Sequence, residues 1–128
     1  MKHFEDYLEI MYYIEKNNQK ITSIEIAKEL KVSKSSVSQM LRKLKKEEFI
    51  NFEPYKEITL LEKGRNLGKK IAKNHITLEK LFTKIGVSKS IALKDIHGLE
   101  HYLSHETIQA IEKLNLHLEK HPLDNNTN

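Results

Sequence analysis

The stretch TSIEIAKELKVSKSSVSQMLRKLKK at residues 22–46, followed by INFEPYKEITL at residues 50–60, decides the fold. Thr22 and Ser33 are typical helix N-cap residues, and the break at 31–32 separates a short helix from a longer one. The second stretch predicts two strands joined by a turn over 54–57, because Pro54 sets turn geometry. Two helices joined by a tight turn and followed by a β-hairpin predict a winged helix-turn-helix with a two-stranded wing.

The flanking sequence predicts a mainly α-helical chain around this hairpin. An apolar stripe indicates a helix over residues 3–17, and a long helix is expected from about Gly64 to about Ile85. Further helices are predicted over roughly 90–103 and from Ser104 to about 121, where Pro122 closes the last one. We therefore expect a winged helix-turn-helix domain at 1–70, an all-helical domain at 71–121 and a disordered tail at 122–128.

Composition restricts the class of protein. With 38% apolar and 31% charged residues in a chain of 128, apolar surface for a core is limited, so association between subunits is expected to bury more of it. The absence of cysteine means that any metal must be held by nitrogen and oxygen ligands. Apolar runs of signal-peptide or membrane-spanning length are absent, which predicts a cytoplasmic protein without membrane contact.

Positive charge gathers in the first half of the chain. Residues 1–70 hold 15 Lys and Arg against 11 Asp and Glu, whereas residues 71–128 hold 7 of each. A basic half indicates a polyanion partner. On the helix that starts after Ser33, polar side chains lie opposite the apolar stripe and suit contacts with the bases and phosphates of double-stranded DNA. These residues are Ser33, Ser35, Ser36, Ser38, Gln39, Arg42, Lys43 and Lys46, with Tyr55 and Lys56 expected at the wing tip. Ordinary solvated surface is the alternative for each of them taken singly.

Histidine gathers in the second half, where six of the seven histidines lie between His75 and His121. At spacings of three and four, His97, Glu100 and His101 are expected to share one helix face, as are His75 and Glu79. Converging imidazoles and carboxylates can hold a divalent first-row metal. The other four histidines are expected at the surface: His3, His105, His117 and His121.

A pair of acidic residues, Asp6 and Glu9, lies beside the apolar stripe of the first predicted helix. Burying a bare charge is expensive, so carboxylates that flank a buried seam need a partner. A solvated acidic edge is the plain alternative.

Together these motifs resemble the diphtheria-toxin-repressor family of metal-dependent transcription regulators, and within it the short manganese transport regulators. The resemblance covers about residues 3–118, in the family's order and spacing. The matching motifs are Glu5-Asp6-Tyr7-Leu8-Glu9, Val37-Ser38-Gln39-Met40, Tyr55-Lys56 with Leu60-x-x-Lys63-Gly64, His75-x-x-x-Glu79, and Gly98-Leu99-Glu100-His101-Tyr102-Leu103-Ser104.

By position, the resemblance implies a homodimer built from the C-terminal helices and a divalent metal, Mn, Fe, Co, Ni or Zn. The implied ligands are Asp6, Glu9, His75, Glu100, His101 and residue 97, with Glu79 ancillary. At position 97 the manganese regulators carry glutamate and the iron-responsive branch carries cysteine, whereas this chain has histidine, His97. An imidazole in place of a carboxylate favours Fe, Co, Ni or Zn over Mn. The number of metals bound per subunit, one or two, stays open.

The expected function is therefore a metal-dependent DNA-binding regulator, a repressor of metal-uptake genes whose bound metal fixes the dimer in the operator-binding conformation. Two other interpretations compete with it. His97-x-x-Glu100-His101 matches the H-x-x-E-H motif of inverted zinc proteases. The second competing interpretation is a winged-helix regulator that needs no metal, in which the histidines are incidental surface residues.

Overall fold

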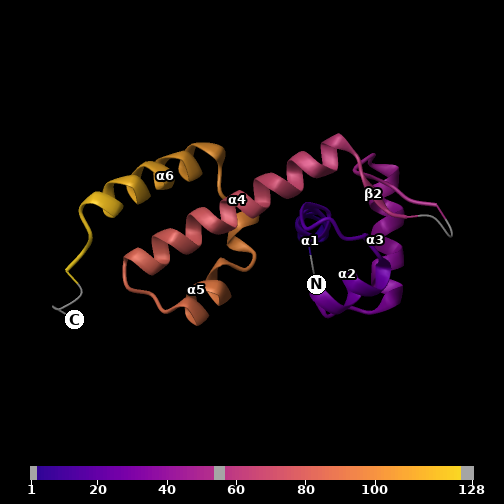
Figure 1. The fold of residues 1–128 in the computed structure, drawn as a ribbon, viewed down its shortest axis with the longest axis horizontal. Helices are drawn as coiled ribbons and strands as arrows, with labels where there is room; N and C mark the ends of the chain where they lie inside the picture. The colour runs from indigo at the N-terminus through magenta and orange to yellow at the C-terminus, as the bar shows by residue number, and fades with distance from the viewer. Residues whose placement is uncertain (1–2, 54–56, 125–128) are drawn as a thin grey trace. The chain divides into compact units, whose positions relative to one another are not determined.

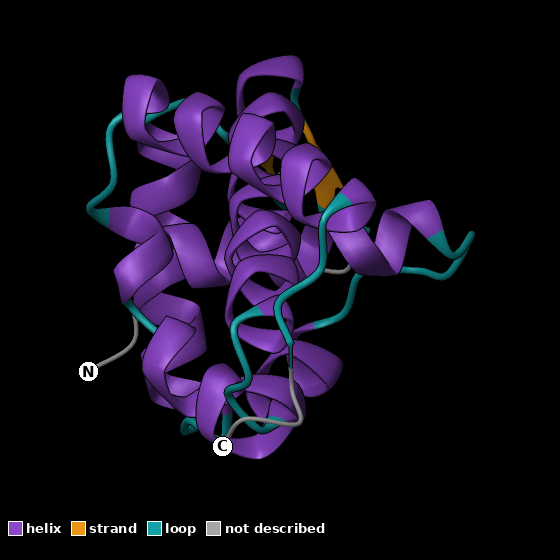
Figure 2. Ribbon diagram, turned by 90° about the vertical axis from the view of Figure 1, so that its left-hand side faces the viewer, coloured by secondary structure: helices purple, strands orange, loops and turns teal. Residues whose placement is uncertain are grey.

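The computed structural model describes residues 3–53 and 57–124, and Figure 2 shows that they are mainly helical, with one short sheet. The order of elements along these residues is α1 (Phe4–Lys16), α2 (Ser23–Leu30), α3 (Lys34–Lys46), β1 (Ile50–Asn51), β2 (Thr59–Leu60), α4 (Glu62–Lys84), α5 (Lys89–Ile96), the 3-10 helix η1 (Leu99–His101) and α6 (His105–Lys120). They divide into two compact units, one up to Ile71 and one from Ala72, and α4 contributes to both. None of the described helices combines the length and apolar character needed to cross a membrane.

The first unit is the predicted winged helix-turn-helix (indigo to magenta in Figure 1). Its turn forms because α2 ends at Lys31 in a left-handed conformation with a φ of 56°, and because the hydroxyl of Ser33 then accepts the backbone N–H of Ser36 to start α3. Strands β1 and β2 pair antiparallel, with Ile50 opposite Leu60. The predicted turn residues Pro54, Tyr55 and Lys56 lie outside the described residues, as do residues 125–128 of the predicted tail.

The core of the first unit draws on all three of its helices and on the wing. Its fully buried side chains include Leu8, Met11, Ile26, Leu41 and Ile50. The first turns of α4 close this core, since a Cβ added at Gly68 would lie 2.5 Å from the carbonyl oxygen of Leu8. Glycine at this position therefore lets the α4 and α1 backbones approach closely.

The second unit has a smaller buried core, formed by Leu78, Ala92, Ile96 and Ile108 from α4, α5 and α6. Much apolar surface stays outside it. Leu114, which the helical stripe of α6 predicts to be buried, is exposed. Nine of the eleven large apolar side chains exposed among the described residues belong to this unit: Ile76, Ile85, Ile91, Leu93, Leu99, Tyr102, Leu114, Leu116 and Leu123.

The predicted single helix over 90–103 is wrong. Helix α5 ends at Ile96, His97 forms its C-cap, and Gly98 takes a φ of 95°, which no right-handed helix accommodates. Glu100 and His101 then follow on the short η1 helix. His97 consequently does not share a continuous helix face with Glu100 and His101.

Candidate functional site

His75 on α4 lies between two carboxylates of the second unit. Its Nδ1 is 3.3 Å from Oε2 of Glu100, and its Nε2 is 3.6 Å from Oε2 of Glu79. The predicted proximity of His75 and Glu79 is therefore present. In a metal-bound imidazole one ring nitrogen binds the metal, and the other usually donates its N–H to a carboxylate or carbonyl. The two ring nitrogens of His75 suit these two roles.

The carboxylate of Glu100 is buried, at 2% exposure. Its Oε1 is 3.9 Å from Nε2 of His101, and its Oε2 has no hydrogen-bond partner although Nδ1 of His75 lies 3.3 Å away. The side chain of Asn74 donates to the backbone carbonyl of Glu100 at 3.4 Å and so ties η1 to α4.

The chemistry of the donors around Glu100 suits a divalent metal. A buried carboxylate oxygen without a hydrogen bond is costly unless a cation neutralises it. Glu100 is flanked by His75 and by His101, whose side chain is 3% exposed. Two imidazoles and a carboxylate are a nitrogen and oxygen donor set that first-row divalent metals accept.

His97, the remaining histidine of the predicted cluster, occupies a different environment. It is exposed at the end of α5, whereas Glu100 and His101 are enclosed on η1. The sequence alone could not separate these environments, because the spacing of three and four holds only if the helix continues through Gly98.

The acidic pair of the first unit lies on α1. Asp6 is 6% exposed and its Oδ2 accepts the backbone N–H of His3 at 3.0 Å, while Glu9 is half-buried. Burial, followed by the neighbouring charge of Asp6, raises the pKa of Tyr7 above its ordinary value. Both predicted acidic residues thus lie in protected positions rather than on a solvated edge.

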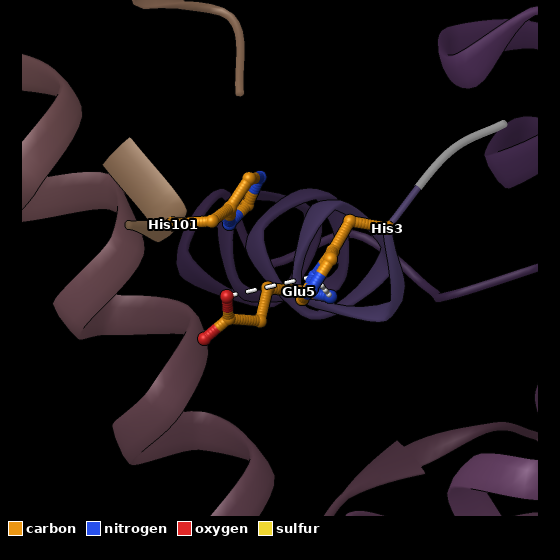
Figure 3. Close-up of side chains that lie close together, drawn as sticks. All are labelled: His3, Glu5 and His101. Atoms are coloured by element: carbon orange, nitrogen blue, oxygen red, sulfur yellow. Dashed lines mark hydrogen bonds and ion pairs between the residues drawn. The ribbon is translucent and has the colours of Figure 1, made fainter. Parts of the chain in front are cut away.

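Sequence reasoning missed the role of His3, which was expected to be surface. His3 is the N-cap of α1, where its Nδ1 accepts the N–H of Glu5 at 3.1 Å and its own N–H binds Asp6, which together form a capping box. Figure 3 shows His3 beside Glu5, and Nδ1 of His3 lies 3.5 Å from Oε1 of Glu5. The available signal was an acidic residue three positions after a polar one, with histidine in the place usually held by Ser or Thr.

The polar face of α3 is the second candidate surface. All eight residues predicted there are exposed, and α3 contains no acidic residue. The hydroxyl groups of Ser33 and Ser36 bond to each other at 3.0 Å at the start of the helix, and the cationic side chains follow along it. Tyr55 and Lys56, predicted at the wing tip, lie outside the described residues.

Two sequence models of one family match almost the whole chain. The iron-dependent repressor N-terminal DNA-binding domain matches residues 1–58, and the iron-dependent repressor metal-binding and dimerisation domain matches residues 61–127. The second match therefore contains His75, Glu79, His97, Glu100 and His101.

Individual relatives agree with this. The HTH-type transcriptional regulator MntR of Listeria welshimeri is 36% identical over 118 residues, which is 92% of this chain and 83% of that protein. Among solved structures, the manganese regulator SloR matches with a TM-score of 0.79 at 26% identity over 89% of this chain, and the crystal structure of ScaR with bound Zn²⁺ matches with a TM-score of 0.72 at 28% identity over 88%. This chain spans about half the length of those two, 54% and 53%.

Proposed function

Because the chain belongs to the iron-dependent repressor family and is a metal-dependent DNA-binding transcriptional regulator, we propose that it represses genes as a homodimer on double-stranded operator DNA. The resemblance to the diphtheria-toxin-repressor family is confirmed. The zinc-protease interpretation of His97-x-x-Glu100-His101 is wrong, since the relatives are transcriptional regulators. Because operator DNA would be its target, the protein is proposed to act in the cytoplasm.

The metal centre is proposed to be built on His75, Glu100 and His101. The observation that carries this is the buried Glu100 carboxylate, whose Oε2 has no hydrogen bond and which lies between two imidazoles. A bound divalent cation would supply the positive charge that this carboxylate lacks. Glu79 would accept the other N–H of His75 and hold its ring in the ligating orientation.

Asp6 and Glu9 are proposed to complete the ligand set, as the family resemblance implies. Both are carboxylates in protected positions on α1, where a bound cation would offset the cost of burying their charge. Since α1 belongs to the DNA-binding unit, a metal that takes ligands from both units would favour one arrangement of them. If the favoured arrangement is the one that binds DNA, the metal acts as a co-repressor.

His97 is proposed as a further ligand, as the family resemblance implies for position 97, and as such it would shift metal preference toward Fe, Co, Ni or Zn and away from Mn, because imidazole is a softer donor than carboxylate. The test is a competition between Mn²⁺ and Zn²⁺ for the native chain and for His97→Glu. We expect His97→Glu to raise relative Mn²⁺ affinity. Tight one-to-one Mn²⁺ binding with weak Zn²⁺ binding in the native chain would overturn this preference.

DNA recognition is proposed to use the exposed face of α3. Gln39 can pair with an adenine edge, while Arg42, Lys43 and Lys46 suit the phosphate backbone. A dimer would present two such helices, whose separation must match the spacing of the operator half-sites. The exposed apolar residues of α5 and α6 supply the surface that this dimer would bury.

The experiment starts from random duplex DNA, from which the full chain selects a preferred sequence in the presence of Mn²⁺ and, separately, Zn²⁺. Fluorescence anisotropy then compares the affinity for the selected duplex with each metal and with chelator. We expect metal to tighten binding by about 5–150-fold, and Glu100→Gln to remove that response. Glu106→Gln, an exposed change on α6, serves as the matched control. Equal affinity in chelator would instead support the metal-independent regulator.

A further inference from the structure

The C-terminal end of α6 carries a second pair of metal-ligating side chains, one in the last turn and one at the C-cap, separate from the Glu100 centre. His117 and His121 are four residues apart and both are exposed. Their imidazole centroids lie 4.7 Å apart, with the ring planes inclined by 34°. Their sequence spacing alone predicts plain surface for both, because neither has a carboxylate at a convincing spacing.

This separation suits chelation of one ion. Two imidazoles bound to one metal at about 2.0–2.1 Å place their ring centroids roughly 4.5–5 Å apart. The rings of His117 and His121 already lie in that range, so each ring can supply one nitrogen to a shared ion when side-chain rotation aims it there. The backbone N–H of His121 donates to the carbonyl of His117 at 2.9 Å, so the spacing of the two residues is fixed in advance, which lowers the entropic cost of binding.

The surroundings select the class of metal. At helical spacing, Lys113 and Lys120 flank the pair, and the carboxylate of the nearby Glu119 lies 3.5 Å from the ammonium group of Lys84. Imidazole nitrogen is therefore the main donor offered by α6 here. Metals that prefer oxygen ligands, such as Mn²⁺, Mg²⁺ and Ca²⁺, gain little from it, whereas Zn²⁺, Ni²⁺ and Cu²⁺ bind imidazole well.

We propose that His117 and His121 form an accessory site on α6 that chelates Zn²⁺, Ni²⁺ or Cu²⁺ through two imidazole nitrogens, with water completing the coordination. The site shares no residue with the centre around Glu100. Having fewer protein ligands, it is expected to fill at higher metal concentration than that centre. One chain then binds imidazole-preferring metals at two places and Mn²⁺ at one.

The test follows the imidazole NMR signals of all histidines in the full chain during a Zn²⁺ titration. We expect the signals of His117 and His121 to shift together, at a higher Zn²⁺ concentration than the signals of the Glu100 centre. In a separate titration with Mg²⁺ and no other divalent metal, the signals of His117 and His121 should stay unchanged. In His117→Gln the response of His121 should require at least about tenfold more Zn²⁺, since one ligand of the chelate is lost. His121→Gln should affect His117 in the same way.

His105→Gln, an exposed substitution at the other end of α6, is the matched control and should leave both responses unchanged. Glu100→Gln should weaken the first phase of the titration only, which separates failure of this site from failure of the regulatory centre. An His121 response at the same Zn²⁺ concentration in His117→Gln and in the native chain would overturn the proposal. So would the absence of any response of the pair.

Discussion

At the scale of single residues, the carboxylate of Glu100 determines the chemistry of the second unit. It is nearly inaccessible to solvent, and one of its oxygens makes no hydrogen bond. The neighbouring imidazoles of His75 and His101 can compensate this charge by being protonated or by sharing a metal with it. Metal sharing leaves the imidazoles neutral, which is the state in which histidine binds metals.

Glu79 gives a prediction about the support of this centre. Replacing Glu79 by Gln removes the carboxylate 3.6 Å from Nε2 of His75 and should lower Zn²⁺ or Mn²⁺ affinity by about 10–100-fold, because the ring loses its orienting partner. Isothermal titration calorimetry measures the change. Glu112→Gln is the control, since Glu112 pairs with Lys73 instead. Equal losses in the two variants would argue against a role for Glu79 at the metal.

A second residue-scale prediction concerns pH. The hydrogen bond from Arg65 lowers the pKa of Glu15; partial burial opposes this effect and the charge of Arg65 adds to it. The pair therefore stabilises the folded chain at pH values above the unfolded glutamate pKa of about 4.3. That contribution is lost as the pH falls through the lower folded pKa. Because both side chains are about a third exposed or more, Glu15→Gln should cost only about 0.2–1 kcal/mol at pH 7.

Urea unfolding at pH 7 and at pH 3 checks this prediction. The difference between the native chain and Glu15→Gln should shrink at the lower pH. A difference that grows on acidification would show that the ion pair with Arg65 does not stabilise the fold.

At the scale of elements, the close approach of α4 to α1 depends on Gly68. Gly68→Ala places a methyl group 2.5 Å from the carbonyl oxygen of Leu8, so the two helices must separate, at an expected cost of about 1–3 kcal/mol. Urea unfolding followed by circular dichroism measures the loss. Asn66→Ala, an exposed change in the same helix, should cost less than Gly68→Ala. Unchanged stability in Gly68→Ala would mean that this contact is not tight.

The elements that the sequence predicts correctly are those with local signals. Ser33 and Ser104 cap α3 and α6 as expected, since a hydroxyl at an N-cap acts within three residues. The helix over 90–103 failed because apolar periodicity does not report the backbone conformation of Gly98. The contact of His75 with Glu100 joins residues 25 positions apart, so no local pattern could predict it, and only the family resemblance placed the two residues together.

At the scale of the whole molecule, the exposed apolar side chains predict how the chain assembles. Ile91 on α5 and Leu116 on α6 are 54% and 62% exposed in a unit whose own core is small. If they lie in the proposed dimer, the double variant Ile91→Glu/Leu116→Glu should be monomeric, because buried unpaired carboxylates oppose association. Sedimentation velocity of the purified chain distinguishes the two states.

Ile24 provides the matched control for this experiment. It is 68% exposed on α2, in the DNA-binding unit, so Ile24→Glu should leave the dimer intact. A dimer that persists in the double variant, or that is lost equally in Ile24→Glu, would contradict assembly through α5 and α6.

Metal binding and DNA binding are proposed to be coupled within one chain. Coupling between two binding sites is reciprocal, so the selected duplex must raise metal affinity by the same factor by which metal raises duplex affinity. The most direct measurement is therefore a Zn²⁺ titration of the full chain with and without the saturating duplex. Zn²⁺ should bind more tightly in the presence of DNA, by the factor that anisotropy gives, about 5–150-fold. Identical Zn²⁺ affinity in the two titrations would contradict it.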